Sequence, residues 1–147
     1  MNRSAGPRRR RLVAWIAFAP AASRALASPV APPVPPPTGP AAFAARAMAL
    51  RDEAVRRGDQ PYGAVVVMGD RIVGEGVSAV IARGDTDAHA ERLAIADARR
   101  RLGTADLDGA RIYGSSPACA ACRAAARDAR IARLYHGAAA TDDGPPS

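Results

Sequence analysis

Two short motifs in this sequence contain residue types that bind metal ions and move protons. The first, "HAE", places His89 two residues before Glu91; the second, "CAAC", holds the only cysteines, Cys119 and Cys122. Two thiolates and one imidazole supply three protein ligands to a tetrahedral zinc ion, and a fourth position left to water is typical of catalytic zinc. Zinc lowers the pKa of water from about 15.7 toward about 7. The motifs therefore indicate zinc-assisted hydrolysis, with Glu91 as a carboxylate free to carry protons.

These side chains can meet only if each motif begins a helix. In mid-helix, positions i and i+2 point to different sides, so His89 and Glu91 can share a target only at a first turn. The loop "RGDTD" precedes them and makes Asp87 the expected N-cap. Cys119 and Cys122 stand three apart at another expected helix start, where unpaired amides favour thiolates. We expect both starts at one edge of a sheet.

The elements that must position these motifs follow from apolar periodicity. Apolar residues at spacings of four, three and four predict a helix over 41–58, closed by Gly58. Two β-branched runs around Gly69-Asp70 predict a hairpin over 62–80. We further expect a helix over 88–103, a strand over 110–115, a helix over 119–130 and a strand over 131–137. This alternation predicts parallel pairing with right-handed crossovers, and hence a three-layer α/β domain with at least four strands.

The basic character of the chain is concentrated in its first 27 residues. The net charge is +7, but six of the 21 basic residues lie there without any acid, and the remaining chain has 15 basic and 14 acidic residues. The body therefore gives no electrostatic reason to expect polynucleotide binding.

The same segment has the order of a secretory signal. Four arginines, Arg8 to Arg11, precede an apolar stretch over 12–19 that is too short to span a bilayer, and Ala25-Leu26-Ala27 offers a cleavage site after Ala27. The paired arginines resemble a twin-arginine signal. We therefore expect a periplasmic or secreted protein. The alternative is a cytoplasmic protein whose Arg- and Ala-rich extension carries no address, and cytosolic retention of a reporter fused after Ala27 would favour it.

Three further segments follow this expected signal. Residues 28–40, "SPVAPPVPPPTGP", predict an extended Pro-rich linker. Residues 41–140 carry the folding signals of one domain. Residues 141–147 have turn chemistry without an apolar period, which predicts a flexible tail.

The motifs also resemble those of a known family. His-x-Glu followed by Cys-x-x-Cys is the signature of zinc deaminases that act on nucleobases. The stretches "PYGAVVVMGDRIVGEG", "DTDAHAERLAI" and "RIYGSSPACAACRAA" resemble the cytidine deaminase-like superfamily, most of all its purine-acting branch of guanine deaminases and tRNA adenosine deaminases. The resemblance spans about residues 41–140. It implies a three-layer α/β/α sandwich with a mixed sheet of four or five strands, truncated at the C-terminus.

The resemblance also implies residue roles. Carried over by position, it makes His89, Cys119 and Cys122 the zinc ligands and Glu91 the proton shuttle. The substrate-binding positions that we infer from it are Gly63, Ala64, Ser78 and Ser115.

The sequence departs from the family pattern at three places. Thr86-Asp87 stands where relatives have Pro-Thr, Pro117-Ala118 where they have Glu-Pro, and Ser78 where they have a base-gripping Asn. No Asn occurs beyond Asn2. A serine can offer one hydrogen bond where an amide offers a paired donor and acceptor, so base recognition must differ here.

Together these features predict a zinc-dependent hydrolytic deaminase of a small purine base or nucleoside. Nucleic acid is not an expected partner, and the resemblance implies a homodimer. Two alternatives stay open at the level of function: a non-catalytic, zinc-stabilised degenerate deaminase fold, and a tRNA adenosine deaminase-like editing enzyme. The cysteine pair could instead be a thioredoxin-like redox pair or a short-loop disulfide. Tyr62 could stack on a base or could be a half-buried aromatic at a strand start.

Overall fold

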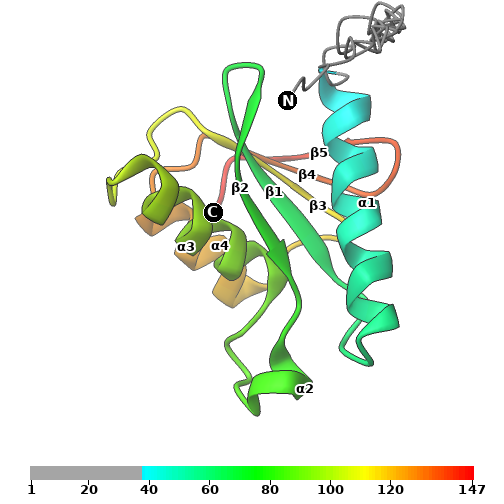
Figure 1. The fold of residues 1–147 in the computed structure, drawn as a ribbon. Helices are drawn as coiled ribbons and strands as arrows, with labels where there is room; N and C mark the ends of the chain where they lie inside the picture. The colour runs from blue at the N-terminus through cyan, green and yellow to red at the C-terminus, as the bar shows by residue number, and fades with distance from the viewer. Residues whose placement is uncertain (1–37) are drawn as a thin grey trace, which may run out of the picture. The chain divides into compact units, whose positions relative to one another are not determined.

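A computed structural model describes residues 38–147, which form a five-stranded mixed sheet with helices on both faces (Figure 1). The strand order is β2-β1-β3-β4-β5. The strands are β1 (Gly63–Met68), β2 (Arg71–Val77), β3 (Arg111–Gly114), β4 (Arg133–His136) and β5 (Thr141–Gly144). The helices are α1 (Pro40–Arg56), α2 (Val80–Arg83), α3 (Ala90–Leu102) and α4 (Ala120–Asp128). Helix α1 lies on one face, and α3 and α4 lie on the other, so the expected three-layer α/β/α sandwich is confirmed.

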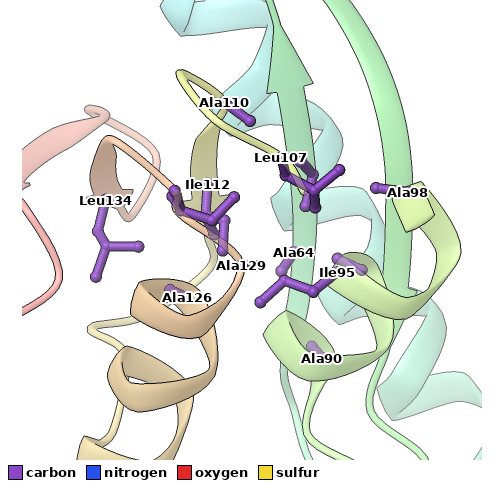
Figure 2. Packing of buried hydrophobic residues seen from close by; sticks show 13 residues of the cluster. Ala64, Ala90, Ile95, Ala98, Leu107, Ala110, Ile112, Ala126, Ala129 and Leu134 are labelled. Atoms are coloured by element: carbon purple, nitrogen blue, oxygen red, sulfur yellow. The ribbon is translucent and has the colours of Figure 1, made fainter. Parts of the chain in front are cut away.

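Strand β1 is buried on both faces because it lies between β2 and β3 in the sheet. Val65 and Val67 pack with Phe43 and Leu50 of α1. The intervening side chains of β1 point the other way, into a larger cluster with α3 and α4 (Figure 2). That cluster contains Ala64, Val66, Ala90, Ala94, Ile95, Ala98, Leu107, Ala110, Ile112, Ala126, Ala129, Ile131 and Leu134. The period-2 alternation of β1 therefore builds both halves of the core.

The predicted hairpin is confirmed, but the predicted parallel pairing is only partly right. Strands β1 and β2 pair antiparallel around Gly69-Asp70, with Gly69 at φ 62°, a left-handed conformation that glycine adopts easily. Strands β3 and β4 are parallel, whereas β1 pairs antiparallel with β3 and separates it from β2. The crossover through α3 thus passes over β1. Because β2 and β3 are each antiparallel to β1, they run in the same direction, and the segments that follow them emerge at one sheet edge.

Helix α3 packs directly against the backbone of β2 because the strand presents two buried glycines to it. A Cβ placed on Gly76 would lie 1.9 Å from the carbonyl oxygen of Ala90, and one on Gly74 would lie 2.4 Å from that of Ala94. Any side chain at either glycine would push the helix outward. This contact fixes the height above the sheet at which α3 begins.

Both ends of the described region correct the boundaries expected from sequence. Helix α1 begins at Pro40, inside the expected linker, because a proline at the first helical position already has helical φ and needs no amide partner. The expected tail forms β5 over Thr141–Gly144, which pairs antiparallel with β4 while Arg133 Nε donates to the Asp142 carboxylate at 2.8 Å. The expected signal over 1–27 and most of the linker, residues 28–37, lie outside the described residues. No helix within residues 38–147 has both the length and the apolarity needed to cross a membrane.

Candidate metal centre and pocket

His89 and Glu91 lie at the start of α3, as the sequence requires. His89 is itself the N-cap, with extended φ and ψ of −69° and 148°, and Glu91 is in the first helical turn. The prediction that Asp87 is the N-cap is wrong. Asp87 lies two residues further out, where it accepts a hydrogen bond from Arg92 Nη1 at 2.7 Å and does not cap the helix. His89 is therefore the last extended residue before α3, and from this position its ring points toward the cysteines of α4.

Cys119 and Cys122 occupy the matching position at the start of α4. Cys119 is the N-cap, and its Sγ accepts a hydrogen bond from the Cys122 backbone N–H at 3.4 Å. Cys119 is exposed and Cys122 is buried, and both are free cysteines. The short-loop disulfide considered from the sequence is therefore absent from the structure.

The three side chains converge with the spacing of zinc ligands. The Nδ1 atom of His89 lies 3.3 Å from Cys122 Sγ and 3.5 Å from Cys119 Sγ, and all three ligand atoms lie within 4.8 Å of one another. Zinc bonds of about 2.3 Å to sulfur and about 2.0–2.1 Å to nitrogen place such ligands about 3.5 Å apart in a tetrahedron. His89, Cys119 and Cys122 thus fit a zinc ion with little rearrangement.

Glu91 lies next to this cluster with its side chain largely shielded from water. Its Oε2 lies 3.5 Å from Cys122 Sγ, and the residue is 8% exposed. Burial raises the pKa of the Glu91 carboxyl. Burial, with the neighbouring Glu91 carboxylate as the next cause, also raises the pKa of the Cys122 thiol. Metal binding must therefore displace a thiol proton, which couples metal affinity to pH.

A pocket of about 410 Å³ opens over these groups. Its volume lies toward the lower end of the ~300–1,000 Å³ typical of small-molecule sites. The lining residues come from the segment before β1, the starts of α3 and α4, and the loop after β3: Gln60, Tyr62, His89, Glu91, Ser116, Pro117, Cys119 and Cys122. All four residues singled out for chemistry therefore share one cavity.

The four expected substrate-binding positions do not line this pocket. Gly63 and Ala64 are buried in β1, where α1 and the core pack against them. Ser115 links β3 to β1, because its Oγ accepts a hydrogen bond from the Gly63 N–H at 3.1 Å. Ser78 is 2% exposed, and its hydroxyl donates to Asp59 Oδ1 at 2.8 Å. A direct contact of these residues with substrate stays a prediction.

The residues that do line the pocket beside the chemical groups were mostly missed. Ser116, Pro117 and Gln60 lie in loops that come together only in the folded chain. For Gln60 the sequence did contain a signal of a possible binding role, because Gln60 is the only residue beyond Asn2 that has a carboxamide side chain. The sequence left two roles open for Tyr62, stacking on a base or packing at a strand start. In the structure Tyr62 lines the pocket and is 41% exposed.

The fold and the convergent cluster define a class of protein: an α/β/α domain that holds zinc between the first turns of two helices. Residues 39–138 match the family described as the cytidine and deoxycytidylate deaminase zinc-binding region, and the chain belongs to this family. The expected zinc cofactor is confirmed, because the matched region is the family's zinc-binding region and His89, Cys119 and Cys122 are placed to hold a metal ion.

The relatives of this chain include a guanine deaminase and a tRNA-specific adenosine deaminase. The chain is 38% identical over 101 residues to guanine deaminase of Bacillus subtilis, covering 68% of this chain and 65% of that protein. It is 35% identical over 89 residues to the tRNA-specific adenosine deaminase of Buchnera aphidicola, covering 60% of this chain and 59% of that protein. The crystal structure of the B. subtilis guanine deaminase superposes with a TM-score of 0.62 at 36% identity, over 65% of this chain and 61% of that one. The chain thus spans about three fifths of the length of these relatives.

Proposed function

We propose that this protein is a zinc-dependent hydrolytic deaminase of a small purine base or nucleoside. The observation that carries the proposal is a buried carboxylate that lines a pocket together with a set of zinc ligands. Glu91 Oε2 lies 3.5 Å from Cys122 Sγ, and both residues line the same cavity. His89, Cys119 and Cys122 would hold the zinc ion, which would supply the Lewis acidity that makes water nucleophilic near neutral pH.

In this proposal Glu91 moves the protons of the reaction. Its carboxylate accepts a proton from the attacking water and passes it to the adjacent ring nitrogen, and it then carries the second proton of that water to the exocyclic nitrogen. The carbon–nitrogen bond then breaks, a carbonyl forms on the ring and ammonia leaves. A carboxyl group in a largely water-free site suits both transfers, because it can hold a proton between the two steps. The first turn of α3 keeps this carboxyl at a fixed distance from the metal ligands.

The substrate class follows from pocket size and from the relatives. About 410 Å³ suits a base or nucleoside rather than a larger ligand held entirely inside. Guanine deaminase of B. subtilis, which acts on a purine base, matches 68% of this chain. These points support a purine whose amino-bearing carbon can reach the metal-ligand end of the pocket.

The test replaces Glu91 with Gln in zinc-loaded full chain and measures ammonia release from guanine, adenine, adenosine, guanosine and cytosine. Glu91→Gln keeps the shape of the side chain but cannot shuttle protons, so we expect zinc content to stay stoichiometric and kcat to fall by about 10²–10⁴-fold. Glu53→Gln, on the far side of the sheet on α1, is the matched control and should keep full activity.

Unchanged turnover in Glu91→Gln would refute the proposed role of this carboxylate. Absence of ammonia release from every compound, with zinc bound stoichiometrically, would favour the non-catalytic zinc-stabilised fold instead.

A second candidate substrate is adenosine in tRNA, favoured by the 35% identity to a tRNA-specific adenosine deaminase. The charge of residues 28–147, 15 basic against 14 acidic side chains, argues against it, because RNA affinity depends strongly on neutralising phosphates. Inosine formation in a tRNA transcript, measured beside the free-base panel, decides between the two substrates.

A further inference from the structure

Among the residues that line the pocket, one carries a carboxamide side chain, Gln60. Gln60 is the only Asn or Gln among residues 38–147, and it lines the pocket together with Tyr62. The hydrogen bonds that Gln60 makes within the described residues come from its backbone. Its N–H donates to Asp59 Oδ1 at 2.8 Å, and its carbonyl accepts from the Tyr62 N–H at 2.8 Å. The carboxamide is therefore available to a ligand.

From this placement we infer that Gln60 is the residue that recognises the edge of the purine base. The inference rests on the proposed deaminase function and adds to it the group that selects the substrate. A carboxamide offers one acceptor oxygen and two N–H donors on a single plane. It can therefore pair with a ring edge on which a donor lies next to an acceptor, as a glutamine does with adenine N6 and N7. Purines present such edges.

The other polar side chain considered for this task is already occupied. The Ser78 hydroxyl donates to Asp59 Oδ1, and the residue is 2% exposed. Its backbone N–H donates to the Tyr62 carbonyl at 3.0 Å, so Ser78 stabilises the segment that lines the pocket. Releasing its hydroxyl would leave a buried carboxylate with one donor fewer.

Asp59 holds the Gln60 segment in place. Its carboxylate accepts hydrogen bonds from the Gln60 N–H and the Ser78 hydroxyl on one oxygen, and from the Ile81 and Ala82 N–H groups, at 3.0 and 2.9 Å, on the other. The Asp59 N–H in turn donates to Ala54, at the end of α1. The backbone at Gln60 is thus tied to two helices before any ligand binds. Because this backbone is already held in place, binding needs to order only the side-chain rotamers of Gln60.

Steady-state kinetics and equilibrium binding on zinc-loaded full chain test this inference. Gln60→Met keeps the length of the side chain without hydrogen bonding, and Gln60→Glu replaces the N–H donors with an acceptor. The first measurement is kcat and KM for the panel of purines. The second is the dissociation constant for guanine and for adenine, determined by calorimetry in the Glu91→Gln background, where turnover does not interfere. Arg56→Met, exposed at the end of α1, is the matched control.

We expect Gln60→Met to weaken binding of the preferred purine by roughly 5- to 150-fold, the discrimination given by one bidentate amide pair. KM should rise, kcat should change less than KM, zinc content should stay stoichiometric, and the preference among purines should narrow. Gln60→Glu should change the order of preference among the purines, because the side chain loses the N–H donor of its bidentate pair with the base.

Unchanged dissociation constants and an unchanged order of preference in both Gln60 variants, in a protein that does release ammonia, would overturn the inference and leave the deaminase proposal standing. Failure of the Glu91→Gln protein to bind any purine, with no ammonia released by the unaltered chain, would overturn both.

Discussion

Because α3 packs closely on Gly76, we predict that adding one methyl group at this position, in Gly76→Ala, will displace the start of α3 and disturb the metal centre. In Gly76→Ala the new Cβ would lie 1.9 Å from the Ala90 carbonyl oxygen and 2.6 Å from the Ala94 nitrogen. Ordinary contact begins near 3.4 Å, so the start of α3 must move by about 1.5 Å. The obstructing atoms are backbone, which cannot rotate away as a side chain can. The substitution therefore belongs at the upper end of overpacking costs, about 3 kcal/mol.

The displaced turn carries His89 and Glu91, so stability and function should fall together. About 3 kcal/mol corresponds to a decrease in Tm of roughly 10 to 20 °C for a domain of this size. A displacement of about 1 Å can reduce catalysis about 10²-fold, and metal affinity should fall as the imidazole leaves its position. Thermal unfolding followed by circular dichroism gives the Tm, and competition with a chromophoric chelator gives the zinc affinity.

Gly74→Ala is the matched control for this experiment. Its Cβ would lie 2.4 Å from the Ala94 carbonyl oxygen and 2.6 Å from the Ala98 nitrogen, further along α3 and away from the metal ligands. We expect a comparable loss of stability with a smaller loss of zinc affinity. If Gly76→Ala kept the Tm and zinc affinity of the unaltered chain, or if the two variants lost zinc affinity equally, the reasoning from helix position would be refuted.

Two further changes test the pocket wall. Tyr62→Ala should raise KM for a purine by roughly 5- to 100-fold with zinc content unchanged, because a stacking aromatic contributes about 1–3 kcal/mol per base, whereas Tyr62→Phe should behave like the unaltered chain; equal KM in all three proteins would exclude stacking. For Asp59, burial raises the pKa, but hydrogen bonds from Ala82, Gln60, Ser78 and Ile81 outweigh it and hold the pKa below its ordinary value. The folded pKa lies below the unfolded one, so this contribution to the free energy of unfolding is present above about pH 4 and is lost as the pH falls through the folded pKa. Urea unfolding between pH 3 and 6 should therefore show a shallower acid loss in Asp59→Asn than in the unaltered chain, and parallel curves would contradict the assignment.

Local signals were sufficient to predict most elements and the parts of the metal centre. The Gly69-Asp70 turn specifies its own hairpin, and the motifs around His89 and Cys119 lie where loops change into apolar helix periods. Such features depend on a few neighbouring residues, so they can be recognised without knowing the fold. The convergence of the two helix starts followed from topology, because β2 and β3 run in the same direction.

The elements that were missed depend on contacts between distant residues. Strand β5 has no apolar alternation and is held by its pairing with β4 and by Arg133 on Asp142. The parallel pairing assigned to β2 and β3 failed because β1 could occupy the position between them while remaining the hairpin partner of β2. Ser78 lies 19 residues from the carboxylate that engages it, and no local pattern indicates that pair.

In the proposed deaminase, the chemistry and the substrate recognition are carried by separate parts of the fold. The potential zinc ligands and Glu91 are fixed by the first turns of α3 and α4, whose positions are set by glycine contacts and by the core. The remaining pocket wall comes from the segment before β1, which Asp59 ties to α2 through hydrogen bonds, and from the loop after β3, which Ser115 ties to β1. Loop side chains can therefore change without moving the metal ligands. A chain that has a serine in place of a base-gripping asparagine can keep the same hydrolytic chemistry, provided that another pocket residue supplies the lost donor and acceptor. Gln60 satisfies that condition among the described residues, so substrate preference should respond to Gln60 while zinc affinity responds to Gly76.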